Sequence, residues 1–318
     1  MSTSFSPSRP KVSVATEYGN AASFWVEYPT GLIDLTRSAH LPNGNKVQSN
    51  IIESPVTTIP PALDVDSQFE LDVDGRTVRL GRASTAIVII DMQNFFLHPD
   101  LRQHPTGLAC VDPLLKAVPA LRSLGAEIIW VNWGLTDPEL LTIPPSLVRG
   151  FTKSGRGGFG SRISTGSGSQ ISQISVSNEN ENGKGWGRLL MRGEKNADLY
   201  GPLQELYERG VEEGTDVWVH KNRMSGLWGP QSALDLHLQE RGITSLLFAG
   251  VNADQCVLGT LVDSYFRGYD CIVLRDAIAT TSPTGGLENV LYNSAGSYGF
   301  VTDTTQVVDA VKKFARAT

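Results

Sequence analysis

The sequence predicts an α/β protein with three layers, in which a parallel sheet lies between two layers of helices. From Ser84 onward, short apolar runs alternate with longer segments of helical periodicity. Strands that alternate with helices along a chain form parallel sheets with helices on both faces. Gly125 and Gly242 follow two of the helical segments, and glycine is the usual residue just beyond the end of a helix.

The first strand is expected at 84–91, where the run STAIVIID is apolar almost throughout. A continuous apolar run indicates a strand that is buried on both faces of a parallel sheet. By the same criteria we expect further strands at 126–132, 216–220, 245–250, 270–274 and 299–302. The intervening helices are expected at 112–124, 198–209, 230–241, 253–267 and 305–317.

Two segments depart from this alternation. Residues 1–80 are rich in Pro, Ser and Thr and predict an N-terminal arm with short strands, including a hairpin at 69–80 around Asp74 and Gly75. This arm is expected to cover the core or a neighbouring subunit. Residues 146–187 form an insertion with the Gly/Ser-rich stretch GRGGFGSRISTGSGSQ, for which we expect no regular structure, and which is either disordered or a lid.

The composition excludes several classes of function. The net charge is −6, without a basic stripe, so we expect no nucleic-acid partner. The apolar runs are far too short for a membrane span, and the polar N-terminus does not resemble a signal peptide. Three cysteines cannot form a disulfide framework, so a reducing, cytoplasmic location is expected.

Three chemically reactive side chains follow the predicted strands. Asp91 ends the first strand, Lys221 ends the third, and Cys256 lies just after the fourth. The ligand of a parallel α/β sheet sits at the carboxyl ends of its strands, so an acid, a base and a thiol are expected to converge there.

This combination of residues suits nucleophilic catalysis. The thiolate is the attacking species. Lys221 and the first turn of the helix that follows Gly250 would stabilise its negative charge. Asp91 would take the thiol proton and pass it to the leaving amine. Backbone N–H groups around Asn252 and Cys256 would stabilise the oxyanion.

Each of these residues also has an ordinary structural interpretation. A lone Cys is more often a small buried apolar residue, Asp91 alone could cap a helix, and a single Lys is usually solvated. Cys110 and Cys271 are interpreted as structural. A metal at His98 and His104, which flank a proline-rich loop, is a less favoured alternative, because no His pair has zinc-ligand spacing on one helix.

The motifs AIVIIDMQNFF, HKNRMSGLWG and LLFAGVNADQCVLGTLVDSYFRGYDCIVLRDA resemble those of the isochorismatase-like cysteine hydrolases. The resemblance covers roughly residues 81–318, the expected hydrolase domain. It implies a Rossmann-like isochorismatase fold, with a six-stranded parallel sheet in the order 3-2-1-4-5-6. It also implies the triad Asp91, Lys221 and Cys256, a cis peptide bond at Val251–Asn252, and an oxyanion hole at Asn252 and Cys256.

The resemblance separates several activities within the family. Nicotinamidases place zinc-binding histidines after the second strand, whereas VNWGLTDPE contains none, so we expect neither a metal nor another cofactor. True isochorismatases typically lack the cysteine. The segments IIWVNWG and RLLMRGEKNADLYGPLQEL are similar to stretches of ureidoacrylate and biuret amidohydrolases. Members are usually dimers or tetramers, so a homo-oligomer is expected.

The expected function is cleavage of a C–N bond in a small amide or ureide through a Cys256 thioester. The alternatives are an isochorismatase-type vinyl-ether hydrolase and a non-catalytic binding or assembly protein. Residues that follow the catalytic positions are expected to line the substrate pocket, which aromatic walls and a few polar groups would form. These residues are Gln93, Asn94, Phe95, Phe96, Trp133, Arg223, Met224 and Trp228.

Overall fold

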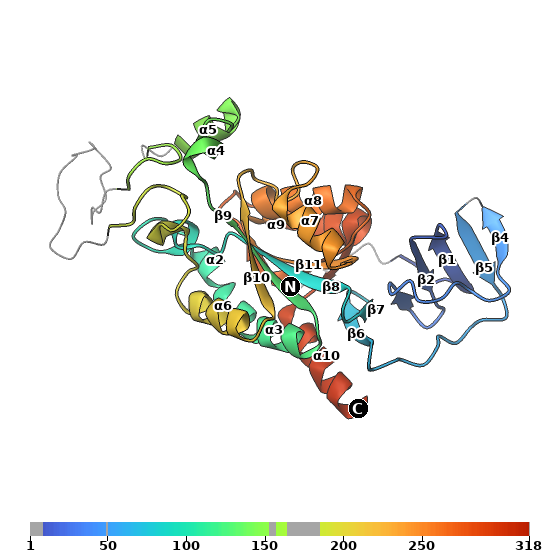
Figure 1. The fold of residues 1–318 in the computed structure, drawn as a ribbon. Coiled ribbons are helices and arrows are strands. Elements are labelled where there is room, and N and C mark those ends of the chain that lie inside the picture. The colour runs from blue at the N-terminus through green and yellow to red at the C-terminus, as the bar shows by residue number, and fades with distance from the viewer. Residues whose placement is uncertain (1–8, 49, 153–156, 164–184, 318) are drawn as a thin grey trace.

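The computed structural model describes residues 9–48, 50–152, 157–163 and 185–317 (Figure 1). Within these residues the strands form two sheets, one of seven strands and one of six. The six-stranded sheet is made of β8 (Thr85–Ile90), β9 (Glu127–Trp133), β10 (Asp216–Lys221), β11 (Ser245–Val251), β12 (Asp270–Ala279) and β13 (Gly299–Thr302).

The six-stranded sheet is parallel throughout, in the order β10-β9-β8-β11-β12-β13. Counted along the chain, this is the order 3-2-1-4-5-6, so the predicted fold class is confirmed. Strands β8 and β11 lie side by side at the centre of the sheet. The strands that follow β8 along the chain are added on one side of this pair, and those that follow β11 are added on the other side. Ligands of such sheets bind outside the carboxyl ends of the strands at this switch point.

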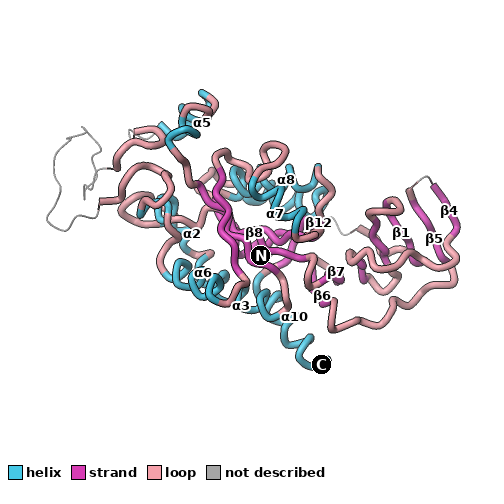
Figure 2. The backbone as a smooth tube through the Cα atoms, in the orientation of Figure 1, coloured by secondary structure: helices cyan, strands magenta, loops and turns pink. Residues whose placement is uncertain are grey.

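Helices cover both faces of the sheet (Figures 1 and 2). α3, α6 and α10 share one buried core with Ile87 and Ile89 of β8, and α7, α8 and α9 share the other core with Val88 and Ile90. The helices are α1 (Asn94–Leu97), α2 (Pro105–Leu108), α3 (Val111–Ser123), α4 (Asp137–Leu140), α5 (Pro145–Thr152), α6 (Pro202–Glu212), α7 (Ala233–Glu240), α8 (Leu258–Phe266), α9 (Gly286–Asn293) and α10 (Thr304–Ala317).

Several element bounds differ from the sequence expectations. The helix expected at 198–209 begins only at Pro202, because proline fits the first turn of a helix, and a short 3₁₀ turn, η1 (Lys195–Ala197), precedes it. The helix expected at 253–267 begins as a π-helical turn, η2 (Ala253–Val257). Helix α9, followed by the π-helical η3 (Ser294–Tyr298), was not predicted, and β12 extends to Ala279.

The insertion at 146–187 is described only in part. Helix α5 occupies Pro145–Thr152, where no regular structure was expected, and residues 157–163 are also described. The expectation of a lid falls mostly on residues 164–184, which lie outside the described residues.

Among the residues that the structure does describe, no helix combines the length and apolar character needed to cross a membrane.

The seven-stranded sheet comes from the N-terminal part of the chain and has the order β4-β5-β1-β2-β3-β7-β6. The predicted hairpin is confirmed, since β6 and β7 pair antiparallel and Asp74 and Gly75 form the two-residue loop. Leu71 and Val78 of this hairpin lie in the same core as α3 and α10. The strands are β1 (Ala15–Gly19), β2 (Phe24–Glu27), β3 (Leu32–Asp34), β4 (Asn45–Gln48), β5 (Ile51–Ser54), β6 (Gln68–Val73) and β7 (Arg76–Gly81).

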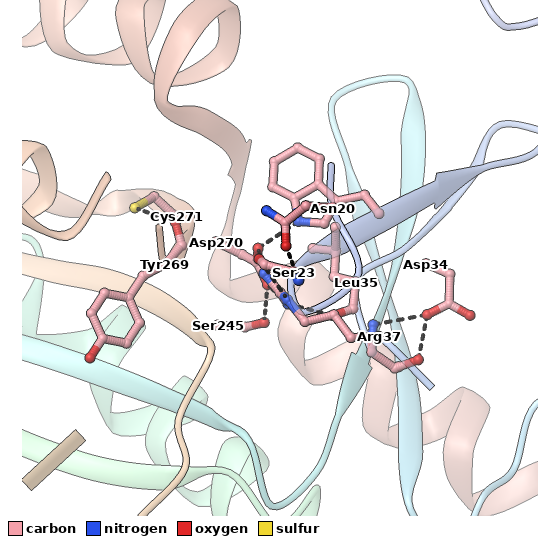
Figure 3. A network of polar contacts seen from close by, with 11 residues as sticks. Asn20, Ser23, Asp34, Leu35, Arg37, Ser245, Tyr269, Asp270 and Cys271 are labelled. Carbon is pink, nitrogen blue, oxygen red and sulfur yellow. Dashed lines mark hydrogen bonds and ion pairs between the residues drawn. The ribbon is translucent and has the colours of Figure 1, made fainter. Parts of the chain in front are cut away.

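Asp270, the first residue of β12, joins the two sheets (Figure 3). Its carboxylate accepts two hydrogen bonds from the guanidinium of Arg37, at 2.7 and 2.8 Å, and one from the indole N–H of Trp25 at 2.7 Å. The Ser245 hydroxyl at the start of β11 donates a fourth. The carboxylate is buried, so these four donors replace the water that it loses on folding.

Candidate active site

Asp91 and Lys221 form a buried ion pair at the carboxyl ends of β8 and β10. The Lys221 Nζ lies 3.0 Å from Asp91 Oδ2, and both side chains are at most 1% exposed. The ammonium also donates to the backbone carbonyls of Arg223 and Met224, at 3.2 and 3.1 Å. Burial raises the pKa of Asp91, and the charge of Lys221 offsets part of that rise.

Cys256 lies in the π-helical turn η2, which follows β11, and its side chain is buried. Burial raises the pKa of its thiol to about 12, while Lys221 lowers it and Asp91 raises it again. The thiol is therefore protonated at neutral pH and lies within the electrostatic reach of both other residues. The structure thus brings together the acid, the base and the thiol that the sequence places at three strand ends.

The turn before Cys256 carries the peptide bond Val251–Asn252, which is cis. The Asn252 side chain is buried and its Oδ1 lies 2.7 Å from Nε2 of His104. The backbone N–H of Gly107 donates to Nδ1 of His104, so Nε2 carries the proton and donates to Asn252. Burial lowers the pKa of His104, which keeps the imidazole neutral.

These contacts bear on the metal alternative at His98 and His104. Both ring nitrogens of His104 are engaged by protein groups, so this side chain offers no lone pair to a metal. The His98 ring packs against Trp186, with 4.5 Å between the ring centroids. Across the described part of the chain, no group of three or more His, Cys, Asp or Glu side chains is arranged to hold a metal ion.

Trp133, the last residue of β9, forms the wall of the site beside Lys221. Its ring centroid lies 4.0 Å from Nζ of Lys221, and its side chain is fully buried. Gln93 fixes the backbone at this point, because its amide donates to the carbonyls of Trp133 and Ala197 and accepts from the Trp133 N–H. The amide of Gln93 therefore holds the strand ends together.

Residues 85–306 match the family model described as the isochorismatase domain. The chain belongs to the isochorismatase family. It is 27% identical to the ureidoacrylate amidohydrolase RutB of Caulobacter segnis over 259 residues, which are 80% of this chain and 94% of that protein. The family resemblance seen in the three sequence motifs is confirmed.

Solved structures of isochorismatase-family proteins share the fold. A cysteine hydrolase from Pseudomonas syringae is 19% identical, with a TM-score of 0.51, and the match covers 74% of this chain and 95% of that one. An isochorismatase family protein from Desulfovibrio vulgaris is 20% identical, with a TM-score of 0.52, covering 72% and 98%. The cis bond at Val251–Asn252, which the family resemblance implied, is present in this member.

The other residues that were expected to line the substrate pocket have different surroundings. Met224 accepts from Lys221 through its carbonyl, and Asn94 donates from its amide to the carbonyl of Lys195 at 2.9 Å. Phe95 and Phe96 are buried in the core. The guanidinium of Arg223 lies 4.7 Å from the ring of Trp228, which is 52% exposed.

Sequence reasoning missed Asn132, which precedes Trp133 on β9. Its side chain is fully buried, and neither amide atom has a hydrogen-bond partner within the described residues. The indole N–H of Trp133 is also buried without a partner there. A buried polar group without a partner costs free energy unless a ligand satisfies it. The signal was the single amide side chain in the apolar run IIWVNW.

Proposed function

We propose that this protein hydrolyses a C–N bond in a small amide or ureide, with Cys256 as nucleophile. The observation that carries the proposal is the convergence of Cys256 with the buried pair of Asp91 and Lys221. Membership of a family that contains the ureidoacrylate amidohydrolase RutB supports it.

Formation of the acyl-enzyme begins with proton transfer from the Cys256 thiol to Asp91. The raised pKa of Asp91, caused by burial, makes its carboxylate a stronger base than a solvated one. The thiolate attacks the amide carbonyl carbon and forms a C–S bond. The C–N bond then breaks, and the protonated Asp91 gives its proton to the departing nitrogen.

The second half of the reaction releases the acid. Asp91 takes a proton from water, the hydroxide attacks the thioester carbonyl, the C–S bond breaks, and the departing thiolate takes that proton from Asp91 to regenerate the thiol. Lys221 balances the negative charge on Asp91 or Cys256 throughout, since its ammonium faces both groups. The N–H groups of Asn252 and Cys256 would stabilise the oxyanion in both steps.

A panel of small amides and ureides tests the proposal, with ammonia release as the readout. The wild type is expected to release ammonia from at least one of them, and Cys256→Ala from none. Cys271→Ala is the matched control, because Cys271 is also a buried thiol but lies within β12, where its sulfur contacts the carbonyls of Leu261 and Tyr269. Equal release by wild type and Cys256→Ala would contradict the thioester route, and no release from any compound would favour an ether hydrolase or a non-catalytic role.

A further inference from the structure

The hydroxyl of Thr260, on α8, joins the two segments that carry the thiol and the ammonium. It donates to the carbonyl of Cys256 at 2.8 Å and accepts from the backbone N–H of Gly226 at 3.1 Å. The side chain of Thr260 is fully buried. Because the N–H of Gly226 can only donate, the single hydroxyl proton belongs to the bond with Cys256. One oxygen atom therefore ties the turn of Cys256 to the segment that follows Lys221.

The segment after β10 sets the position of the Lys221 ammonium. Nζ donates to the carbonyls of Arg223 and Met224, and Met224 lies two residues before Gly226. These carbonyls accept two of the three ammonium protons, and Asp91 lies 3.0 Å from the same nitrogen. The place of the ammonium thus depends on the path of this backbone segment.

Packing around Gly226 leaves its N–H dependent on Thr260. A Cβ at this position would lie 3.0 Å from side-chain atoms of Val131 on β9 and Leu234 on α7. The Gly226 carbonyl accepts from the Ser232 hydroxyl at 2.8 Å, and the residue is buried. A buried backbone N–H that loses its partner costs free energy, so without the hydroxyl the segment would shift to find another acceptor.

Ser264, one turn further along α8, provides an internal comparison. Its hydroxyl donates to the carbonyl of Thr260 at 2.7 Å, and its side chain is also fully buried. Both hydroxyls therefore bond the carbonyl four residues earlier, which is a usual contact of Ser and Thr in helices. Within the described residues, only the hydroxyl of Thr260 adds a bond from the segment after Lys221.

We propose that Thr260 is a positioning residue, whose hydroxyl holds the Cys256 turn and the segment after Lys221 together so that the ammonium faces the thiol. This inference rests on the proposed function, because it concerns the same nucleophile. Thr260 acts through Lys221 and Cys256 and forms no bond to the substrate.

Thiol alkylation tests the inference without a substrate. Thr260→Val replaces the hydroxyl by a methyl group of similar size and removes both hydrogen bonds. The charge of Lys221 lowers the pKa of the Cys256 thiol, so a displaced ammonium leaves less thiolate. At about pH 9, iodoacetamide should alkylate the Cys256 peptide about 5- to 10-fold more slowly than in the wild type, since the thiolate is the reactive form. Thr260→Ala, which lacks the hydroxyl and the added methyl group, should give the same result.

Two further variants separate positioning from a general loss of stability. Thr260→Ser keeps the hydroxyl and should restore the wild-type alkylation rate. Ser264→Ala removes one buried hydroxyl from the same helix and should leave that rate unchanged. Hydrogen exchange of residues 222–229 should be faster in Thr260→Val than in Ser264→Ala, because only the first variant releases this segment.

Turnover of an accepted amide gives the last readout. Thr260→Val should lower kcat by about 10- to 100-fold and change KM by less than about 3-fold, since orientation rather than binding is lost. If no amide is turned over but the alkylation pattern holds, the proposed reaction fails and the positioning role stands. Alkylation of Cys256 as fast in Thr260→Val as in the wild type, or equally slow in Ser264→Ala, would overturn the inference.

Discussion

Lys221 and Asp91 form an ion pair of 3.0 Å in which both side chains are almost inaccessible to water. The pair joins β10 to β8 across the intervening β9, where the indole of Trp133 covers the ammonium. Removing one partner from a buried pair leaves the other charge uncompensated in a medium of low polarity. The pair is therefore a structural element of the site, in addition to the catalytic role that we propose for it.

Lys221→Met should lower the free energy of unfolding by about 3–5 kcal/mol, because Asp91 would remain buried without its partner or take up a proton. Urea denaturation measures this change. Lys312→Met is the matched control, since Lys312 forms an ion pair with Asp309 at 2.7 Å but its side chain is 64% exposed. The control should lose less than about 1 kcal/mol. Equal losses in the two variants would contradict the assignment of a buried, tightly coupled pair.

Asp91→Asn should separate thiol reactivity from turnover. Burial raises the pKa of Cys256 to about 12, Lys221 lowers it and Asp91 raises it. Removal of the Asp91 charge therefore lowers the thiol pKa and increases the thiolate fraction at any pH below about 12. Iodoacetamide should alkylate Cys256 faster in the variant, with a pH profile shifted to lower pH.

The same Asp91→Asn variant should lose about 10²- to 10⁴-fold in kcat, because the general base is absent. The two readouts therefore move in opposite directions. Slower alkylation together with retained turnover would show that Asp91 does not exchange a proton with the thiol.

His104→Ala should reduce kcat by up to about 100-fold, because the Nε2–H of His104 holds the side chain of Asn252 at the proposed oxyanion hole. Steady-state kinetics on an accepted amide measures the effect, which should appear in kcat more than in KM. His237→Ala is a suitable control, since this histidine lies on α7 and contacts Glu127, at the start of β9, at 3.2 Å. If kcat does not fall, the orientation of Asn252 is unimportant for the reaction.

The strand order of the sheet was expected from the family resemblance, whereas the residues themselves predicted the parallel sheet and the meeting of Asp91, Lys221 and Cys256. These features follow from strong local signals, since STAIVIID and its counterparts are apolar runs that end in polar residues. Parallel strands in a right-handed arrangement bring such ends to one edge.

Other features depend on tertiary contacts that a single sequence does not reveal. The hydrogen bond between His104 and Asn252 joins residues 148 positions apart, so the structure was needed to find it. The packing of Phe151 and Phe159 on Trp133 was hidden by the Gly/Ser-rich composition around them. The N-terminal arm was expected to have short strands, but its seven-stranded sheet depends on pairings between distant segments, such as β3 with β7.

Asp270→Asn tests how the N-terminal sheet is attached. The change weakens two hydrogen bonds to Arg37, whose guanidinium is largely buried, and the free energy of unfolding should fall by about 3 kcal/mol. Limited proteolysis should also cut the N-terminal sheet more rapidly than in the wild type. An exposed carboxylate, Asp309, provides the control variant Asp309→Asn, which should change neither quantity measurably.

The most direct test of the central claim is intact mass spectrometry of the enzyme, quenched in acid during turnover of an accepted amide. The account predicts a mass increase equal to the acyl group, located on the peptide that contains Cys256 and absent from Cys256→Ala. Turnover without this adduct in the wild type, or ammonia release by Cys256→Ala at the wild-type rate, would contradict a thioester mechanism at Cys256.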